Sequence, residues 1–183
     1  EPGGQPGLRG EYFKNQDLSG KPVVSRIDPT IQFRSENGNF APDRVEQFSA
    51  RWSGYFIPPT SGSYTFHTRS DDGVRLTIDG RRVIDDWNPH AETLDAYAGR
   101  FEAGKPYAIK IEYFDAGGGG GLGVGVMRSD DSITGNLLAL AKSADVVVLG
   151  VGFDPTTEGE GADRSFALPG AQDVLIRKIA DAN

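Results

Sequence analysis

The sequence predicts a mainly β protein, in which an antiparallel β-sandwich or jelly-roll-like module is followed by a fragment of an α/β sandwich domain. From Leu8 to about Arg128, short runs of alternating apolar and polar residues are broken by glycine, proline and aspartate, which is typical of antiparallel strands with one buried face. After Ser129 the pattern changes to helix-like segments around one continuous apolar run, which is typical of a strand covered on both faces.

Alternation locates several strands of the first module. Residues 64–67 and 74–78 each alternate apolar with polar side chains. Between LTI and RRVI, the pair at 79–80 is Asp-Gly, which suits the positive backbone angles of a two-residue hairpin turn. The runs at 109–113 and 122–126 predict two more strands, joined across a flexible glycine-rich connection.

The residues after Ser129 predict helix, strand, long loop and helix, in that order. ITGNLLALAKSAD is typical of a short helix and DVVVLGVG of a parallel strand, and LPGAQDVLIRKIADAN places Ala171, Leu175 and Ile179 on one helical stripe. A single strand with one helix on each side leaves backbone groups unpaired. We therefore expect residues 131–183 to be a piece of a larger α/β domain or to pair with another chain, after a linker at 1–6 and the β-sandwich at 7–130.

Composition excludes several classes of function. The 19 Lys+Arg and 26 Asp+Glu give a formal net charge of -7, which argues against a nucleic-acid partner and an anionic membrane surface. The absence of cysteine excludes disulfides, thiolate zinc sites and cysteine nucleophiles. No apolar run approaches the roughly 18 residues that span a bilayer, and the first residues lack the zones of a signal peptide. The compartment stays open, with a periplasmic or secreted location favoured over the cytoplasm.

The segment TTEGEGADR at 156–164 places Glu158 and Glu160 in a glycine-rich loop that follows the apolar run. Loops at the carboxyl ends of strands in open α/β sheets often carry ligand-binding and catalytic groups. The glycines on either side of Glu160 let the backbone aim a carboxylate outward. From the residues alone, a solvated acidic loop is the simpler interpretation, and a catalytic loop is the alternative.

Two further features suggest a carbohydrate or cation site. Asp71 and Asp72 lie in SDDG between two strands, where an aspartate-rich turn is the simpler interpretation and joint binding of a hard cation or a sugar hydroxyl is the alternative. Trp87 precedes Asn88 and Pro89, which favours a loop position from which the indole can stack on a sugar ring. Trp52, amid alternating residues, is expected in the core.

Residues 7–128 resemble the protective-antigen-type domain, a lectin-like β-sandwich, through GLRGEYF, FSARWSGYFIPPTSGSYTFHTRSDDGVRLTIDG and VIDDW. The second half resembles the closing α/β sandwich segment of family 3 glycoside hydrolases, chiefly β-glucosidases, through ADVVVLGVG, EGEGADR and LPGAQDVLIRKI. In some members of that family such a module interrupts the sandwich domain. The chain is similar to this insertion together with its downstream junction.

The second resemblance implies that Glu160 is the general acid/base of a retaining glycosidase, with Glu158 as its neighbour and with Asp163 and Arg164 supporting the loop. The nucleophile would be an aspartate on a barrel domain outside these residues, about 5 to 5.5 Å from the acid. Ala162 departs from the family pattern, where an aromatic residue is frequent, so the choice between Glu160 and Glu158 stays open.

The resemblances also imply what the module does and what it binds. In related enzymes the module stands at the active-site rim and limits substrate length, a role that Phe40, Trp87 or Asn88 would serve here. The alternative is an autonomous carbohydrate-binding module, without catalysis, in which Asp71 and Asp72 hold calcium. We expect an oligosaccharide or β-glucoside substrate and the remaining domains of a parent enzyme as partners, and no cofactor unless calcium binds.

Overall fold

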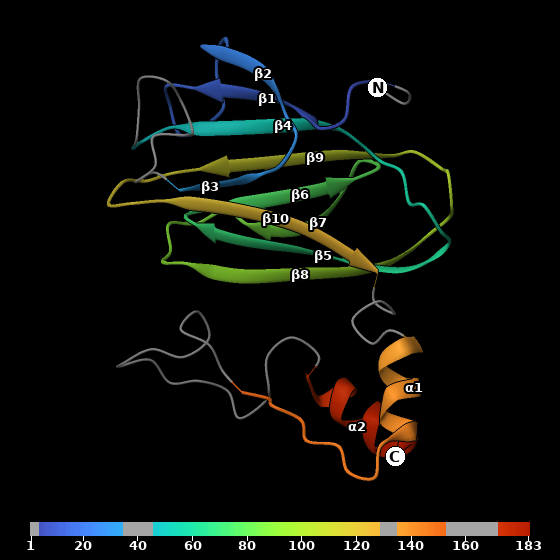
Figure 1. The fold of residues 1–183 in the computed structure, drawn as a ribbon. Coiled ribbons are helices and arrows are strands. Elements are labelled where there is room, and N and C mark those ends of the chain that lie inside the picture. The colour runs from blue at the N-terminus through green and yellow to red at the C-terminus, as the bar shows by residue number, and fades with distance from the viewer. Residues whose placement is uncertain (1–3, 35–45, 129–134, 153–171) are drawn as a thin grey trace. The chain divides into compact units, whose positions relative to one another are not determined.

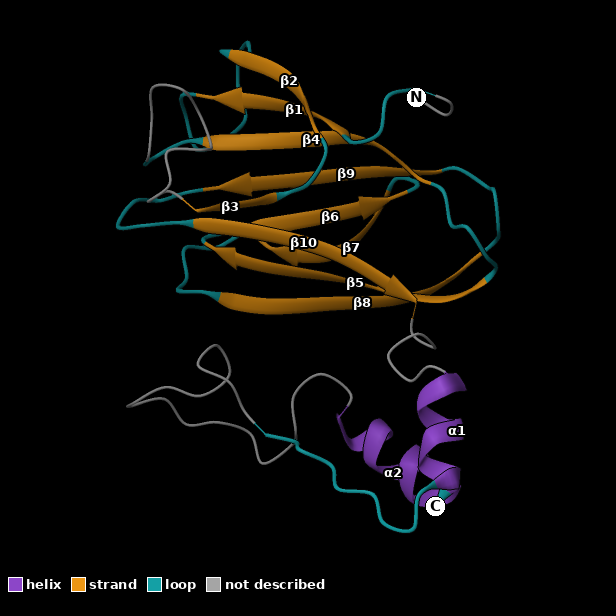
Figure 2. Ribbon diagram, viewed as in Figure 1, coloured by secondary structure: helices purple, strands orange, loops and turns teal. Residues whose placement is uncertain are grey.

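The structure is a computed structural model that describes residues 4–34, 46–128, 135–152 and 172–183. The chain divides into two units, Glu1–Ser129 and Asp130–Asn183. In the part of the chain that is described, the first unit contains β-strands and the second contains two helices (Figures 1 and 2).

The first unit is a sandwich of two antiparallel sheets, as predicted. A six-stranded sheet has the order β2-β1-β4-β9-β6-β7, and a four-stranded sheet has the order β3-β10-β5-β8. The strands are β1 (Leu8–Phe13), β2 (Val24–Asp28), β3 (Gln32–Arg34), β4 (Ser49–Phe56), β5 (Gly62–Asp71), β6 (Val74–Ile78), β7 (Arg81–Asp86), β8 (Thr93–Phe101), β9 (Tyr107–Phe114) and β10 (Gly121–Arg128).

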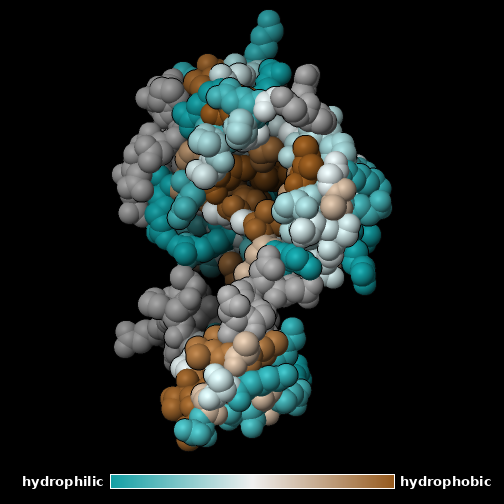
Figure 3. All heavy atoms as spheres, turned by 45° about the vertical axis from the view of Figure 1, so that its right-hand side comes forward, coloured by the Kyte–Doolittle hydropathy of each residue, from teal (hydrophilic) through white to brown (hydrophobic). Residues whose placement is uncertain are grey.

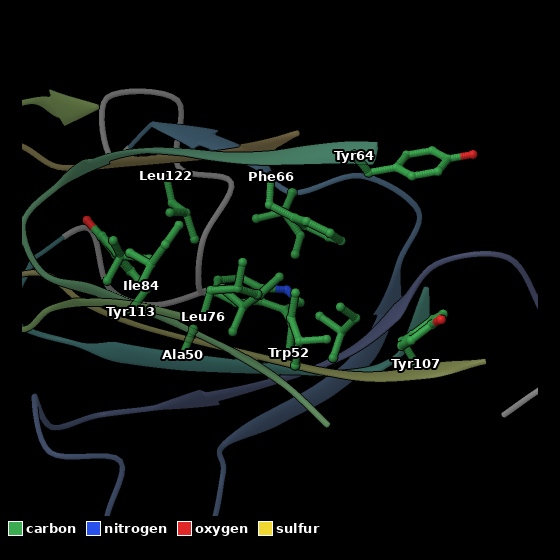
Figure 4. Close-up of a cluster of buried hydrophobic side chains, with 14 of the residues drawn as sticks. Ala50, Trp52, Tyr64, Phe66, Leu76, Ile84, Tyr107, Tyr113 and Leu122 are labelled. Carbon is green, nitrogen blue, oxygen red and sulfur yellow. The ribbon is translucent and has the colours of Figure 1, made fainter. Parts of the chain in front are cut away.

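The core fills the space between the two sheets, because each strand turns every second side chain inward. Ala50, Trp52 and Leu76 project from one sheet toward Phe66 and Leu122 on the other (Figure 4). The expectation for Trp52 is confirmed. Its side chain is fully buried, and its rings stack on Phe33 at 5.7 Å.

The hairpin between β6 and β7 is confirmed at the predicted residues. Asp79 has φ 47° and Gly80 has φ 79°, the two positive values that a type I′ turn requires. The Asp79 carboxylate also accepts a hydrogen bond of 2.8 Å from the backbone N–H of Ala108. The turn is therefore fixed by its own backbone and by the start of β9.

The strands on either side of the glycine run form as predicted, but they belong to different sheets. β9 pairs with β4 and β6, whereas β10 pairs with β3 and β5. Gly117, Gly118 and Gly119 have φ values of 107°, 88° and 101°, in the region that favours glycine. The glycines thus carry the chain from one sheet to the other.

A buried polar network joins β1, β2 and β4. The Asp28 carboxylate accepts hydrogen bonds from the Tyr12 hydroxyl, from Trp52 Nε1 at 2.8 Å and from Arg26 Nε at 2.7 Å. Burial raises the pKa of the Tyr12 hydroxyl, and the neighbouring Asp28 raises it further. Because each donor lies on a different strand, this one carboxylate fixes the three strands together.

An apolar hollow lies between the sheets at the end where β1 begins and β10 finishes. Its volume is about 270 Å³, and its lining includes Leu8 from β1, Phe56 from β4 and Val126 from β10. Figure 3 shows hydrophobic atoms around a hollow in this unit. Figure 1 shows the start of β1 and the tip of β10 on the same side of the sandwich.

The second unit contains α1 (Gly135–Ser143) and α2 (Gln172–Ala182), which match the two predicted helices. Ala141 and Ile179 are buried, and the Asn183 side chain donates to the carbonyls of Ala141 and Ala144 at 2.9 and 2.8 Å. Leu175 is partly buried, whereas Ala171 lies outside the described residues. The predicted helical stripe is therefore seen through Leu175 and Ile179.

The strand predicted at Asp145–Gly152 was wrong, because the described segment forms no strand there. Val146 and Val148 are 76% and 90% exposed. A strand exists only where a neighbour pairs with its backbone, and the described part of this unit contains no strand that could pair with this segment. The Gln172 side-chain amide bonds both backbone groups of Gly152, its N–H and its carbonyl, at 2.8 Å.

Candidate functional site

Three loops that cross between the sheets meet around one carboxylate, and we call them the crossing-loop junction: Asp71–Gly73, Trp87–Glu92 and Asp115–Gly120. Asp72 is buried, with Oδ1 accepting from the backbone N–H of His90 at 3.0 Å and Oδ2 from that of Ala116 at 2.6 Å. Both oxygens of Asp72 therefore hold neighbouring loops in place. The sequence placed Asp72 in a turn but gave no sign of this role.

Asp71 stands in a different environment from its neighbour. The peptide bond between Asp71 and Asp72 is cis. The backbone carbonyl of Asp71, rather than its carboxylate, accepts a hydrogen bond from the buried Tyr113 hydroxyl. Burial raises the pKa of the Asp71 carboxyl, and the negative charge of Asp72 raises it further. Asp71 is partly exposed, whereas Asp72 is buried.

Asp115 is the residue of this junction that sequence reasoning missed. It is fully buried, and its Oδ1 accepts from the backbone N–H of Gln47 at 2.8 Å. Its Oδ2 has no hydrogen-bond partner among the described residues. Burial raises the pKa of this carboxyl, and the charge of Asp72 adds to the increase. An aspartate between a strand and a glycine run was the signal in the sequence.

Trp87 lies in the junction with one face of its ring covered. The Arg75 guanidinium stands 4.1 Å from the centre of the indole, and the Phe114 ring meets the indole edge-on at 4.8 Å. The indole is partly buried, while Asn88 and Pro89 beside it are exposed. The loop therefore presents a partly buried indole beside the exposed Asn88.

Asp71 and Asp72, the two expected calcium ligands, both lie at the junction. Calcium takes six to eight oxygen ligands, and each Asp72 oxygen also accepts one backbone N–H group. Nowhere in the described residues do three His, Cys, Asp or Glu side chains gather with a geometry that could hold a metal. Calcium binding by Asp71 and Asp72 stays a prediction.

The catalytic residues expected from the sequence cannot be placed. Glu158, Glu160, Asp163 and Arg164 lie outside the described residues, and so does Phe40. Neither described helix is long and apolar enough to cross a membrane.

Comparison with known sequences gives two kinds of match, one over the first unit and one over nearly the whole chain. Residues 4–136 match the family model described as the PA14 domain. Anti-sigma-I factor RsgI3 of Acetivibrio thermocellus is 45% identical over 111 residues, which are 59% of this chain and 17% of that protein. Beta-glucosidase B of Emericella nidulans is 27% identical over 206 residues, which are 98% of this chain and 24% of that protein. The chain thus spans a quarter or less of these relatives.

Solved structures share the fold. A beta-glucosidase from Kluyveromyces marxianus superposes with a TM-score of 0.64 at 21% identity, over 97% of this chain and 23% of that one. A PA14 sugar-binding domain from an RTX adhesin superposes with a TM-score of 0.56 at 18% identity, over 68% of this chain and 91% of that one. At these identities the likeness is one of architecture.

Proposed function

The chain belongs to the PA14 domain family, and from this premise we propose that it is the PA14 module and adjoining α/β segment of a retaining β-glucosidase. In this proposal the module shapes substrate specificity at the rim of the active site. The loop at 156–164 supplies the general acid/base that acts on terminal β-glucosyl residues of oligosaccharides. The partners are the sugar substrate and the remaining domains of the parent enzyme.

One observation carries the proposal. The match to Beta-glucosidase B runs through 98% of the chain, whereas the match to the anti-sigma factor covers 59%. If the module were used alone, the residues after Ser129 would have no reason to be similar in sequence to a β-glucosidase. Their agreement supports a parent protein of that enzyme class.

The second unit adds physical support. Val146 and Val148 are highly exposed on an extended segment that has no strand beside it in the described structure. Exposed apolar residues with unpaired backbone groups are costly in water and favour burial in a sheet. Further strands of a parent α/β domain would pair with this segment and cover its valines.

The chemistry follows from two carboxyl groups. A retaining glycosidase needs a protonated acid to donate to the leaving oxygen and a carboxylate to attack the sugar carbon. Glu160 takes the first role, and an aspartate elsewhere in the parent polypeptide takes the second. Burial of the loop by substrate and by the other domain would raise the pKa of the acid, as this step requires.

The test replaces each loop glutamate in the full parent enzyme. We expect Glu160→Gln to lower kcat by about 10² to 10⁴, the range for loss of a general acid or base, and azide to restore turnover of an aryl glucoside with a good leaving group. Glu158→Gln is the matched control and should keep most activity. The opposite result would assign the role to Glu158, and no loss in either variant would remove the loop from catalysis.

The isolated chain should be inactive, because it lacks the proposed nucleophile. We expect no turnover of an aryl β-glucoside by residues 1–183. Measurable turnover that survives repurification and disappears in Glu160→Gln would show that both carboxylates lie within this chain, contrary to the proposal.

A second candidate is a carbohydrate-binding module without catalysis. The observation that favours it is that Asn88 is exposed, and Asp71 and Trp87 are partly exposed, at the crossing-loop junction. Calorimetric titration of the chain with glucose and cellobiose, with and without calcium, tests it. A heat of sugar binding that is lost in Asn88→Ala would support a binding module. If no heat of binding is measured, the role at the active-site rim remains.

A further inference from the structure

The outer face of the four-stranded sheet carries a groove that the proposed function does not use, and we call it the outer-face groove. Two adjoining cavities of about 170 and 240 Å³ share Gln32, Arg69 and Gly123 in their linings. Arg34 and Glu92 line one end. His67 and Leu94 line the other.

The floor of the groove is a row of glycines on β10. Leu122 points into the core, so Gly121, Gly123 and Gly125 occupy the first three outward positions of the strand, followed by Met127. Gly123 lies opposite Gln32 of β3 on one side and Arg69 of β5 on the other. The side chains of the flanking strands therefore stand over a central strand that presents bare backbone.

The fold itself does not require glycine at Gly123 and Gly125. Gly73, outside the groove, gives the contrast, because a Cβ there would lie 2.2 Å from Phe114 and packing explains that glycine. A Cβ on Gly123 would come no closer than 3.9 Å to another atom, and one on Gly125 would meet nothing within 4 Å. Neither residue has a positive φ. Glycine inside a strand weakens it and often marks close approach of a ligand.

The charges at one end of the groove suit an acidic ligand. Arg69 Nε lies 2.8 Å and Arg34 Nη2 lies 3.5 Å from the same oxygen of Glu92. Two guanidinium groups thus face one carboxylate, and their side chains are 38% and 50% exposed. Forked guanidinium donors bind carboxylates in preference to neutral hydroxyls. Asp71, two residues along β5 from Arg69, is not among the lining residues.

We propose that the outer-face groove binds a hexuronate unit of an acidic oligosaccharide. Arg34 and Arg69 hold the sugar carboxylate, and Gln32 and His67 hydrogen-bond its hydroxyls. The glycine floor lets the ring lie flat against the strand, with Leu94 against its apolar face. The aromatic ring in the lining, Phe33, stacks on Trp52, so charge rather than ring stacking selects the ligand.

The first experiment compares tetragalacturonate with cellotetraose, a neutral sugar of equal length, by calorimetry on the 183-residue chain at low salt. We expect the acidic sugar to bind at least tenfold more tightly and to shift the amide resonances of Gly121, Gly123 and Gly125. Binding should persist in EDTA, which separates this site from any calcium-dependent one, and it does not depend on Glu160.

Three variants locate the site. Arg69→Gln should weaken binding at least tenfold, whereas Arg82→Gln, which removes a guanidinium 3.0 Å from Asp85 on the other sheet, should leave it unchanged. Gly123→Val should block the groove while keeping or raising the melting temperature, because a branched side chain suits a strand. A blocked site in a folded protein distinguishes loss of a ligand site from loss of structure.

Several outcomes would overturn the proposal. These are no binding of tetragalacturonate, equal binding of cellotetraose, equal effects of Arg69→Gln and Arg82→Gln, or full binding by Gly123→Val. Amide shifts at the crossing-loop junction instead of the glycine floor would place the ligand elsewhere. Inorganic sulfate that competes as strongly as the sugar would reduce the groove to a simple anion site.

Discussion

Asp71 and Asp72 show how two adjacent, identical side chains take different roles. Asp72 is buried and bridges two loops through their backbone N–H groups. Asp71 is partly exposed, and its backbone rather than its carboxylate is bonded by Tyr113. Structure therefore divides a pair that the sequence presents as equivalent.

Replacing each aspartate by alanine should separate these roles. We expect Asp72→Ala to lower the free energy of unfolding by about 3 kcal/mol, because it leaves two backbone donors without their charged acceptor. Asp71→Ala should change it by less than about 1 kcal/mol, as for most partly exposed positions. Urea denaturation measures both. Equal losses would contradict the assignment of the clamp to Asp72.

Asp115 should make stability depend on pH. Its pKa is raised in the folded state by burial and by Asp72. Its contribution is therefore fully present below the unfolded pKa of about 3.9 and is lost as pH rises through the folded pKa. Asp115→Asn keeps an oxygen for the Gln47 N–H and carries no charge, so its stability relative to the natural chain should rise from pH 4 to pH 7.

Asp85→Asn is the control for this pH profile. Hydrogen bonds from Arg82 and Arg75 lower the pKa of the exposed Asp85 carboxyl. Any effect of Asp85→Asn should be small because of solvent screening, and it should have the opposite sign, with the variant less stable at neutral pH. A pH-independent difference for Asp115→Asn, measured by thermal melts across this range, would contradict the raised pKa.

Sequence reasoning found the turn at Asp71–Asp72 and the loop position of Trp87, but it could not find how they are held. The groups that bind the Asp72 carboxylate are backbone N–H groups of His90 and Ala116, 18 and 44 positions away. Any residue supplies a backbone N–H, so no side-chain pattern marks such a contact. Asp115 likewise accepts from a backbone N–H, that of Gln47, and only its position between a strand and the glycine run marks it in the sequence.

At the scale of strands and helices, local sequence patterns predicted which strands exist but not which strands pair with each other. Alternation located β5, β6, β9 and β10, and the Asp-Gly pair located the hairpin. The glycine run gave no indication that β9 and β10 lie in opposite sheets, because sheet membership depends on partners far away in sequence. The apolar run at 145–152 shows the converse, a strand pattern without a neighbour to pair with.

The hairpin turn offers a direct test at this scale. Gly80→Ala should lower the free energy of unfolding by about 1 to 2 kcal/mol, the cost of a left-handed backbone for a residue with a Cβ. Asp79→Asn is the matched control, since asparagine tolerates the same angles and keeps an acceptor for the Ala108 N–H. Chemical denaturation of both variants should show a loss in the first alone, and similar losses would argue against a type I′ turn.

At the scale of the whole molecule, the two units differ in how much structure they can support alone. The first has an extended core between two sheets. The second buries Ala141 and Ile179 among its described residues and exposes Val146 and Val148. Units of this small size bury too little apolar surface for much independent stability.

Hydrogen exchange should therefore separate the units. We expect amides of β4 and β9, which are central in the six-stranded sheet, to exchange by global unfolding, and amides of α1 and α2 to exchange orders of magnitude faster. Mass spectrometry of peptides from the isolated chain measures this. Equal protection in the helices would mean that the second unit is stable without further partners.

The shared position of the beginning of β1 and the finish of β10 has a consequence for how such a module is inherited. Leu8 and Val126 line the same hollow, so the chain enters and leaves the sandwich at the same end of the two sheets. A host protein can therefore carry the whole module as an insertion in one surface loop, with both connections at one end of the sandwich. The same module can therefore be inserted in unrelated proteins. Its loops can vary in sequence while the fold of the host protein is kept.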